Sequence, residues 1–265
     1  MRDAVRLTAL TVFLSGFTVA AAGLRPEVEV GWTAYVTATE ERMARELSAP
    51  GGFLAVDFTS SGAADRQAAL AGGVVVRPVE TVDASGDALG VPSAMVHHWR
   101  GLVFIPRTTV GEVLTRLMDR VPPQPDVLQS TILERSPNQM LVALRLQRTR
   151  IITAVFNTEH IVTFVRLNSD RAISTSVATK VAEVENAGTP RERELAPGDD
   201  RGFLWRLNAY WRYQQISGGV LAECESISLS RSVPFVVRYF VGPLVESTAR
   251  ESMERTLTAV RQSGN

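Results

Sequence analysis

Cysteine is nearly absent from this sequence. The 265 residues include a single cysteine, Cys224, so no disulfide can form within the chain and no cysteine cluster can hold a metal ion. Cys224 lies in a strand-like run, where a lone thiol is typical of a small buried apolar side chain. We therefore expect Cys224 to be buried.

The chain also lacks an excess of charge of either sign. Its 28 Lys and Arg residues balance 28 Asp and Glu residues, and Lys180 is the only lysine. This balance gives no electrostatic reason to expect binding to nucleic acid or to a membrane surface. With 45% hydrophobic and 21% charged residues, the composition is that of an ordinary globular protein, which excludes global disorder.

Histidine is scarce, and its three positions do not make a metal-binding pattern. His97 and His98 are adjacent on a predicted strand, so their side chains point to opposite faces and cannot hold one ion together. A metal site would need His160 to meet one of them, with a carboxylate such as Glu159. The Ser-x-x-Lys, Gly-x-Ser-x-Gly, Walker and dinucleotide-binding glycine patterns are missing as well. We predict no metal and no other cofactor, and the missing catalytic motif favours a protein that is not an enzyme.

A long apolar run occurs only near the N-terminus. Residues 7–19 carry no charge, follow Arg2 and Arg6, and precede the small residues AAAG. The run is too short for a comfortable membrane span and is typical of a signal peptide. We predict that residues 1–23 are a signal peptide, that the protein is exported to the periplasm or secreted, and that no stable transmembrane span remains after cleavage.

Residues 24–92 read as an N-terminal extension made of a helix and short strands. Apolar residues at spacings of three and four predict a helix over residues 26–47, with proline in its first turn. Residues 53–58 are a strand candidate. Residues 72–82 are a second β-like run, in which Pro78 favours a sheet edge or a bulge. We expect this extension to pack against the rest of the chain.

A regular order of elements begins at residue 93. A strand over residues 95–105 is followed by a helix that Thr108 or Thr109 caps, with Glu112 three residues after Thr109 as in a capping box. Short connections between the next runs predict an antiparallel meander. Its strands cover residues 127–134, 140–148, 151–167 and 171–185. A long charged loop, residues 186–200, follows them.

Residues 201–231 read as two further strands around Ser217-Gly218-Gly219. Alternation separates an aromatic face from a polar one, and neither face is plainly solvent-exposed. If Ser217 lies opposite Val220, Arg212 faces Glu225 across the hairpin. A C-terminal helix follows, with a break or kink at Gly242-Pro243.

The order of one strand, a helix, six antiparallel strands and a long C-terminal helix resembles the START-like superfamily, which includes lipid-transfer, birch-pollen-allergen-like and polyketide cyclase-like proteins. The segments HHWRGLVFIP (97–106), AGTPRERELAPGDDRGFLWRLNAYWRY (187–213) and ECESISLSR (223–231) resemble uncharacterised exported bacterial proteins of this superfamily. The resemblance covers residues 93–262 and carries no catalytic residues with it.

The resemblance implies an α+β helix-grip fold over residues 93–265, in which a curved seven-stranded antiparallel sheet wraps around the C-terminal helix. It also implies an apolar cavity between sheet and helix. Small residues at the middle of the helix, among them Ser247 and Thr248, agree with such a space. We predict that a small hydrophobic ligand, lipid-like or polyketide-like, binds there.

The polar face of the 201–231 strands is our candidate for the polar edge of this cavity. The candidate ligand-binding residues are Arg206, Asn208, Tyr210, Arg212, Glu223, Glu225, Ser247 and Thr248. The alternative for the six strand residues is a solvated ladder on the convex face. Two other functions stay open: a polyketide cyclase or dehydratase that uses Tyr210, Arg206 and a strand carboxylate, and an envelope scaffold that binds a protein partner.

Overall fold

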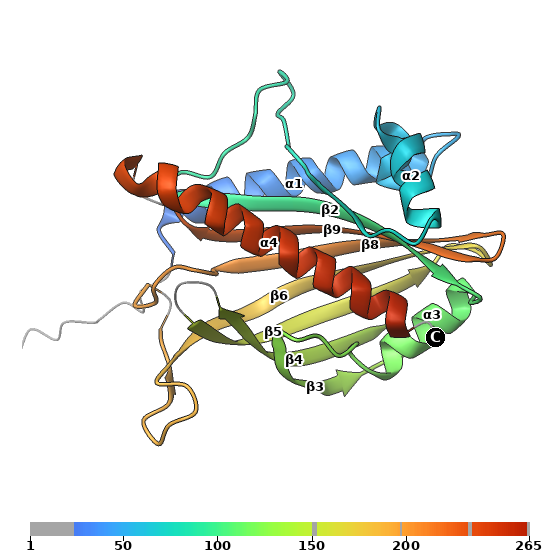
Figure 1. Cartoon of the computed structure of the whole chain (residues 1–265). Coiled ribbons are helices and arrows are strands. Elements are labelled where there is room, and N and C mark those ends of the chain that lie inside the picture. Colours follow the sequence, from blue (N-terminus) through green and yellow to red (C-terminus); the bar gives the residue numbers. More distant parts are fainter. Residues whose placement is uncertain (1–23, 150–152, 197, 233–234, 264–265) are drawn as a thin grey trace, which may run out of the picture.

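One large antiparallel sheet organises the molecule (Figure 1). The computed structural model describes residues 24–149, 153–196, 198–232 and 235–263, with side chains in the last range described from Ala249 onward. The predicted signal peptide, residues 1–23, lies outside the described residues. The sheet has nine strands in the order β1-β2-β9-β8-β6-β5-β4-β3, and β7 pairs with β6. They are β1 (Val75–Pro78), β2 (Ala94–Pro106), β3 (Val127–Arg135), β4 (Gln139–Thr149), β5 (Thr153–Arg166), β6 (Arg171–Glu185), β7 (Arg193–Glu194), β8 (Arg206–Ile216) and β9 (Gly219–Arg231).

The predicted α+β helix-grip fold is confirmed. After β2 come α3 (Val110–Asp119), the antiparallel strands and then the long helix α4 (Phe235–Ser263), which crosses one face of the sheet in Figure 1. The expected seven strands are present, and β1 and β7 extend the sheet to nine. We call the face that α4 crosses the inner face. Its core includes Val103, Tyr213 and Cys224 of the sheet together with Met253 and Leu257 of α4.

The opposite, outer face of the sheet is covered over β2, β8 and β9 by the N-terminal extension. Helix α1 (Pro26–Ser48) packs Trp32, Tyr35 and Met43 against Ile227 and Leu229 of β9. The short 3₁₀ helix η1 (Ala55–Phe58) and helix α2 (Gly62–Leu70) cover the neighbouring part of β2 and β9. Because β2, β8 and β9 have packed layers on both sides, neither face of these strands is free for solvent, as their sequence indicated.

Local sequence signals account for the helix ends. Helix α1 begins at Pro26 with Glu27 and Glu29 in its first turn, where the helix dipole favours negative charge. At the start of α3 the Thr109 hydroxyl accepts from the Glu112 amide, and the Glu112 carboxylate accepts from the Thr109 amide, so the predicted capping box is confirmed.

The strand predicted over residues 53–58 is wrong. The segment forms η1 because side-chain carboxylates satisfy its amides, which a sheet neighbour would otherwise do. The Asp57 carboxylate accepts from the amides of Phe53 and Leu54 at 2.8 and 3.0 Å. The second β-like run, in contrast, supplies β1 at the edge of the sheet and places Pro78 in its last position.

The sequence predicts a break or a kink at Gly242-Pro243. A break is excluded, because α4 continues through both residues as one helix. A kink at Pro243 stays a prediction.

A further difference concerns the β8–β9 hairpin. Ile216 pairs with Gly219, so the turn has two residues, and Gly218 has a φ of 84° that glycine adopts without strain. Arg212 therefore lies opposite Glu223, and the predicted pairing of Arg212 with Glu225 is off by two residues.

Among the described residues, no helix combines the length and the apolar character that a membrane crossing requires.

Candidate functional site

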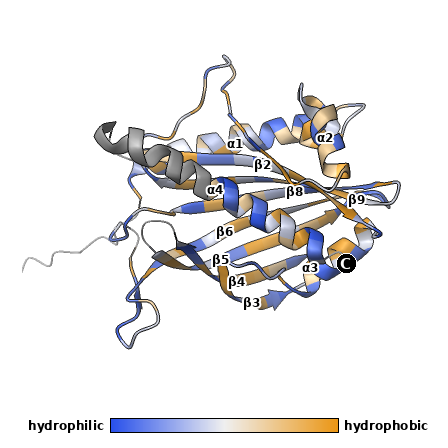
Figure 2. Cartoon of the chain, viewed as in Figure 1, coloured by the Kyte–Doolittle hydropathy of each residue, from blue (hydrophilic) through white to orange (hydrophobic). Residues whose placement is uncertain are grey.

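A pocket of about 530 Å³ lies between the inner face of the sheet and α4. This volume falls within the range of ligand-binding pockets in proteins, roughly 300–1,000 Å³. Its wall comes from β2, β3, β4, β5, β6, β8 and β9, from α3, from the segments before β3 and β8, and from α4. These strands carry many apolar residues, drawn orange in Figure 2. Large apolar members of the wall are Trp99, Leu117, Val142, Phe156, Phe164 and Trp211.

The pocket exists because small side chains stand beneath the helix at the middle of the sheet. Ala209 of β8 and Ser226 of β9 are partners across the hairpin, and both line the pocket. Cys224 and Ser228 flank Ser226 on the same face of β9, and Ala249 of α4 also lines the pocket. Bulky residues at these positions would fill the space. The expectation that Cys224 is buried is confirmed, with 2% of its surface exposed.

Two histidines stand on the wall of the pocket without charge. Burial lowers the pKa of His97 to about 4 and that of His160 to about 4, so both imidazoles are neutral at neutral pH. His97 Nε2 lies 2.9 Å from the Ser230 hydroxyl, and His160 Nε2 lies 2.9 Å from the Thr158 hydroxyl. Burial likewise raises the pKa of Tyr213, which stays protonated. This part of the wall therefore offers neutral hydrogen-bonding groups.

The charged groups of the pocket gather at one end, where α4 meets the segment before β3. The Arg148 guanidinium donates to Asp126 Oδ2 at 2.6 Å and to the Ser252 hydroxyl of α4 at 3.0 Å. Asp126 is 4% exposed. Nearby, the Thr256 hydroxyl of α4 donates to Gln124 Oε1 at 2.8 Å. These contacts attach α4 to the sheet at this end of the pocket.

The six strand residues predicted for the polar edge do not line this pocket. Alternation along β8 and β9 puts Ala209, Trp211 and Cys224 on the inner face, and therefore puts the predicted set on the outer face under the N-terminal extension. The prediction that their face looks into the cavity is wrong for Arg206, Asn208, Tyr210, Arg212, Glu223 and Glu225. The side chains of Ser247 and Thr248 lie outside the described residues.

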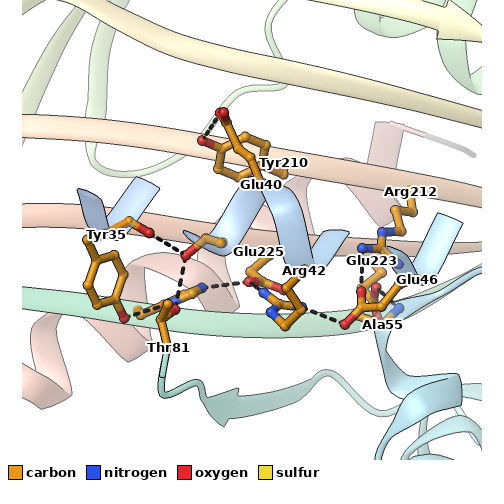
Figure 3. Close-up of polar contacts among 12 residues, drawn as sticks. Tyr35, Glu40, Arg42, Glu46, Ala55, Thr81, Tyr210, Arg212, Glu223 and Glu225 are labelled. Atoms are coloured by element: carbon orange, nitrogen blue, oxygen red, sulfur yellow. Dashed lines mark hydrogen bonds and ion pairs between the residues drawn. The ribbon is translucent and has the colours of Figure 1, made fainter. Parts of the chain in front are cut away.

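On the outer face, strand residues of the predicted set contact α1. Figure 3 shows Tyr210 beside Glu40 of this helix. Arg206 is ion-paired with Glu29, and the Tyr210 hydroxyl, which also accepts from Asn208, donates to Glu40 Oε1 at 2.8 Å. The outer face is thus neither a ligand edge nor a solvated ladder. It is a buried docking surface for a helix.

Arg212 of β8 and Glu225 of β9 attach the sheet to α1. The Arg212 guanidinium donates to Glu46 Oε2 at 2.6 Å and to the Phe53 carbonyl at 2.9 Å. Glu225 accepts from Arg42 and from His98 Nε2, the latter at 2.7 Å. Burial acts to raise the pKa of Glu225, but the His98 hydrogen bond and nearby positive charges outweigh it and hold that pKa below its usual value.

Glu223 holds η1 against the sheet. Its carboxylate accepts from the amides of Ala55 and Val56 at 2.6 and 2.9 Å. The amides and Arg212 act to lower the pKa of Glu223, but burial outweighs them and raises this pKa to about 7.

A cyclase that uses Tyr210, Arg206 and a strand carboxylate would need these groups around one enclosed pocket. The structure separates these groups from the inner pocket by the thickness of the sheet.

Sequence reasoning missed Asp126, Arg148 and Ser252, which no motif marks. The orientation of the hairpin had a usable signal, because the inner face of β9 carries the small residues Cys224, Ser226 and Ser228. His97 and His98 do point to opposite faces: His97 lines the inner pocket, whereas His98 meets α1. Within the described part of the chain, no group of three His, Cys, Asp or Glu side chains is placed to hold a metal ion.

No family model matches the sequence, and no curated protein matches it. Solved structures that are similar in shape include the following three. A STAR-related lipid transfer protein from Xanthomonas axonopodis is 16% identical, with 71% of this chain and 98% of that chain covered and a TM-score of 0.45. The human StarD13 lipid transfer and protein localization domain is 10% identical, with 77% and 95% covered and a TM-score of 0.42. The Zhui aromatase/cyclase from Streptomyces sp. R1128 is 15% identical, with 64% and 94% covered and a TM-score of 0.37.

At this level of similarity the neighbours assign no activity or ligand to the chain. The strand order and the position of α4 establish the fold without them. This chain therefore has a helix-grip fold in which its own N-terminal extension covers the outer face of β2, β8 and β9.

Proposed function

We propose that this protein binds one small, uncharged, mainly apolar molecule between the sheet and α4, and that it does so without chemical conversion. The observation that carries the proposal is the pocket of about 530 Å³, whose wall is mainly apolar with a few neutral polar groups, and whose charged residues Asp126 and Arg148 are paired with each other at one end. His97 and His160 are uncharged there because burial holds the pKa of each at about 4. A charged molecule would lose its hydration in such a pocket, and the mainly apolar wall would replace few of the lost hydrogen bonds.

Binding can be tested with a neutral apolar fluorophore, N-phenyl-1-naphthylamine. We expect saturable fluorescence enhancement with the purified protein. In the double variant Ala209→Trp with Ser226→Phe, which fills the middle of the pocket from adjacent strands, we expect the enhancement to fall at least tenfold.

The matched control is Val177→Trp, a similar enlargement on a half-exposed residue of β6 that does not line the pocket. This variant should bind the fluorophore as the unaltered protein does. Absence of any saturable binding to the unaltered protein would refute the proposal. Equal loss in the control would show that the fluorophore reports on something other than the pocket.

Export belongs to the same proposal. It is supported by the apolar segment of residues 7–19 behind Arg2 and Arg6. Expression of the whole chain in a bacterial host, followed by N-terminal sequencing of the protein from the periplasm or medium, tests it. A protein that stays in the cytoplasm with its first 23 residues intact would contradict export.

A further inference from the structure

One end of strand β2 has a neighbouring strand on one side only. Strand β9 pairs with β2 along its whole length, whereas β1 pairs only with Trp99–Leu102. After β1 the Val79 amide still donates to the His98 carbonyl at 2.9 Å, and the chain then rises away from the sheet (Figure 1). Among the described residues, no strand lies on this side of Ala94–His98. We call Ala94–His98 the open edge of β2.

Alternation along β2 identifies the backbone groups that this edge leaves unpaired. Leu229, the partner of Val96 on β9, turns its carbonyl to the Trp205 amide on the other side of β9. Val96 therefore forms no hydrogen bond with β9, and its amide and carbonyl point to the side of β1, as the His98 carbonyl does. The Ala94 carbonyl points the same way. Within the described part of the chain, none of these groups of Val96 and Ala94 has a hydrogen-bond partner.

The contacts of Thr81 explain why β1 ends before it reaches Val96. Continuation of the β1 register would bring Thr81 opposite Val96. The Thr81 carbonyl accepts instead from the Leu89 amide at 2.8 Å, and its hydroxyl lies 3.0 Å from the Thr39 hydroxyl of α1. Thr81 is 4% exposed, so these contacts are protected from water. The segment that follows β1 is thus held away from Val96.

A pocket of about 430 Å³ lies where a continued β1 would run. It is lined by residues of the open edge, by Tyr35 of α1, by Ser232 and by residues 79–80 and 89–91. Most of these side chains are apolar, and the exposed Glu80 is the only acidic one among them. At about 3.3 Å per residue, the open edge has the length of a strand of about five residues. The pocket shares no lining residue with the pocket under α4.

The geometry points to a strand-addition site: we propose that an extended peptide segment of a protein partner adds to the open edge, in line with β1. A peptide backbone fits because it repeats donors and acceptors at the same spacing as Val96 and Ala94, which a small apolar molecule does not. The side chain opposite Val96 lies on the same face of the sheet, beside Tyr35 and Leu89, so an aliphatic residue fits there. Glu80 favours a basic residue in the segment over an acidic one. This inference goes beyond the proposed ligand binding and does not depend on it.

Amide hydrogen exchange in the purified protein, followed by NMR, tests whether the edge is open. Met95 and His97 alternate with Val96, so their amides point to β9 and form the ladder with Ser230 and Ser228. We expect the Val96 amide to exchange at least about tenfold faster than these two amides. Equal protection of all three amides would mean that the edge is already paired, and would overturn the proposal.

Peptide binding is tested by fluorescence anisotropy with fluorescein-labelled Thr-Val-Lys-Val-Thr. We expect saturable binding, together with slower exchange of the Val96 amide. Two N-methylated peptides identify the mode of binding. With a valine opposite Val96, the valine amides face β2 and the lysine amide between them faces away. Methylation of both valine amides should weaken binding at least about tenfold, and methylation of the lysine amide about threefold at most. Equal affinities of the two methylated peptides, or no saturable binding up to about 1 mM, would overturn strand addition.

Two variants place the peptide on the open edge. Val96→Pro removes an amide that takes no part in the β9 ladder, and proline is tolerated on such an edge. We expect it to weaken peptide binding at least about fivefold, whereas Val96→Ala keeps the amide and should bind within about threefold of the unaltered protein. Equal binding by the two variants would refute the site. Displacement of N-phenyl-1-naphthylamine by the peptide would also refute it, because the peptide would then lie under α4. If Val96→Pro does not fold, the two methylated peptides on the unaltered protein still decide.

Discussion

At the scale of single residues, burial decides which groups carry charge. His97 and His160 face the pocket, are 8% and 4% exposed, and have serine or threonine hydroxyls as partners. Among the described residues no carboxylate is bonded to either ring, and desolvation lowers the pKa of each histidine to about 4. His98 sits one residue from His97 on the opposite face and bonds to the Glu225 carboxylate.

These lowered pKa values make stability depend on pH in a definite direction. In the unfolded chain both histidines titrate near 6.5, whereas in the folded protein each has a pKa of about 4. As pH falls from 6.5 towards 4, the unfolded state takes up protons that the folded state does not, so the free energy of unfolding decreases. We expect a loss of about 2–3 kcal/mol per histidine by pH 4.

Urea unfolding between pH 4 and 7 measures this loss. Carboxylates such as Glu225, whose pKa is lowered on folding, also make the free energy of unfolding decrease as pH falls. The contribution of the histidines must therefore be isolated by comparison with a variant that lacks them. The double variant His97→Gln with His160→Gln should lose clearly less stability over this range than the unaltered protein. Parallel pH profiles would show that the two rings do not titrate as described.

Alternation in the sequence separated the residues of β8 and β9 into two faces but did not say which face looks inward. That choice depends on α1, whose Arg42 and Glu46 provide partners for Glu225 and Arg212 from far away in the chain. No spacing rule links positions so distant. Asp126 and Arg148 were unmarked for the same reason, since a pocket brings them together through packing and not through a motif.

At the scale of elements, the contact between β2 and α4 depends on a glycine in the strand. A methyl group added to Gly101 would lie 2.2 Å from Leu257 Cδ1 and 3.1 Å from Met253 Cγ. Leu257 is fully buried, so it has little room to move away. Glycine inside a strand often indicates such a close approach. The sequence therefore contained a signal for where the helix meets the sheet.

Gly101→Ala should destabilise the protein by about 1–3 kcal/mol, because α4 must shift to admit the methyl group. Urea unfolding at pH 7 measures the change. Gly90→Ala is the matched control, because an added Cβ at Gly90 meets nothing within 4 Å. We expect this control to stay within about 0.5 kcal/mol of the unaltered protein. Equal stability of Gly101→Ala and Gly90→Ala would mean that α4 does not approach β2 so closely.

Elements with strong local signals were predicted well, and those shaped by distant partners were not. Helix α1, the capping box of α3 and strands β2 to β6 follow from periodicity, capping and short connections. Segment 53–58 has the composition of a strand, but Asp57 and Glu223 satisfy its amides and produce η1. The length of the turn, which is the two residues Ser217 and Gly218, likewise sets the register of every pair in the hairpin.

At the scale of the whole molecule, the N-terminal extension completes the fold. It adds β1 to the sheet edge, and α1 and η1 bury the outer face of β8 and β9. Without it Arg212 would lose both Glu46 and the Phe53 carbonyl. Glu225 would lose Arg42, and Glu223 would lose two amide donors. The predicted boundary at residue 92 marks a change in the sequence pattern of helices and strands. The apolar clusters, however, join residues before this boundary to strands after it.

A chain that begins at Ser93 should therefore not reach a stable monomeric fold. Removal of residues 24–92 takes away the partners of Arg212 and Glu225 and also their cover, so these charges become hydrated and the main loss is apolar burial. Exposure of the apolar outer face around Ile227 and Leu229 removes a large share of the roughly 5–15 kcal/mol that stabilises a typical domain and favours aggregation. Size-exclusion chromatography and urea unfolding compare this chain with one that begins at Leu24. Addition of residues 24–92 as a separate chain should restore solubility if docking is the cause. A monomer from Ser93 onward that unfolds cooperatively, within about 2 kcal/mol of the longer chain, would show that the extension is a dispensable cover.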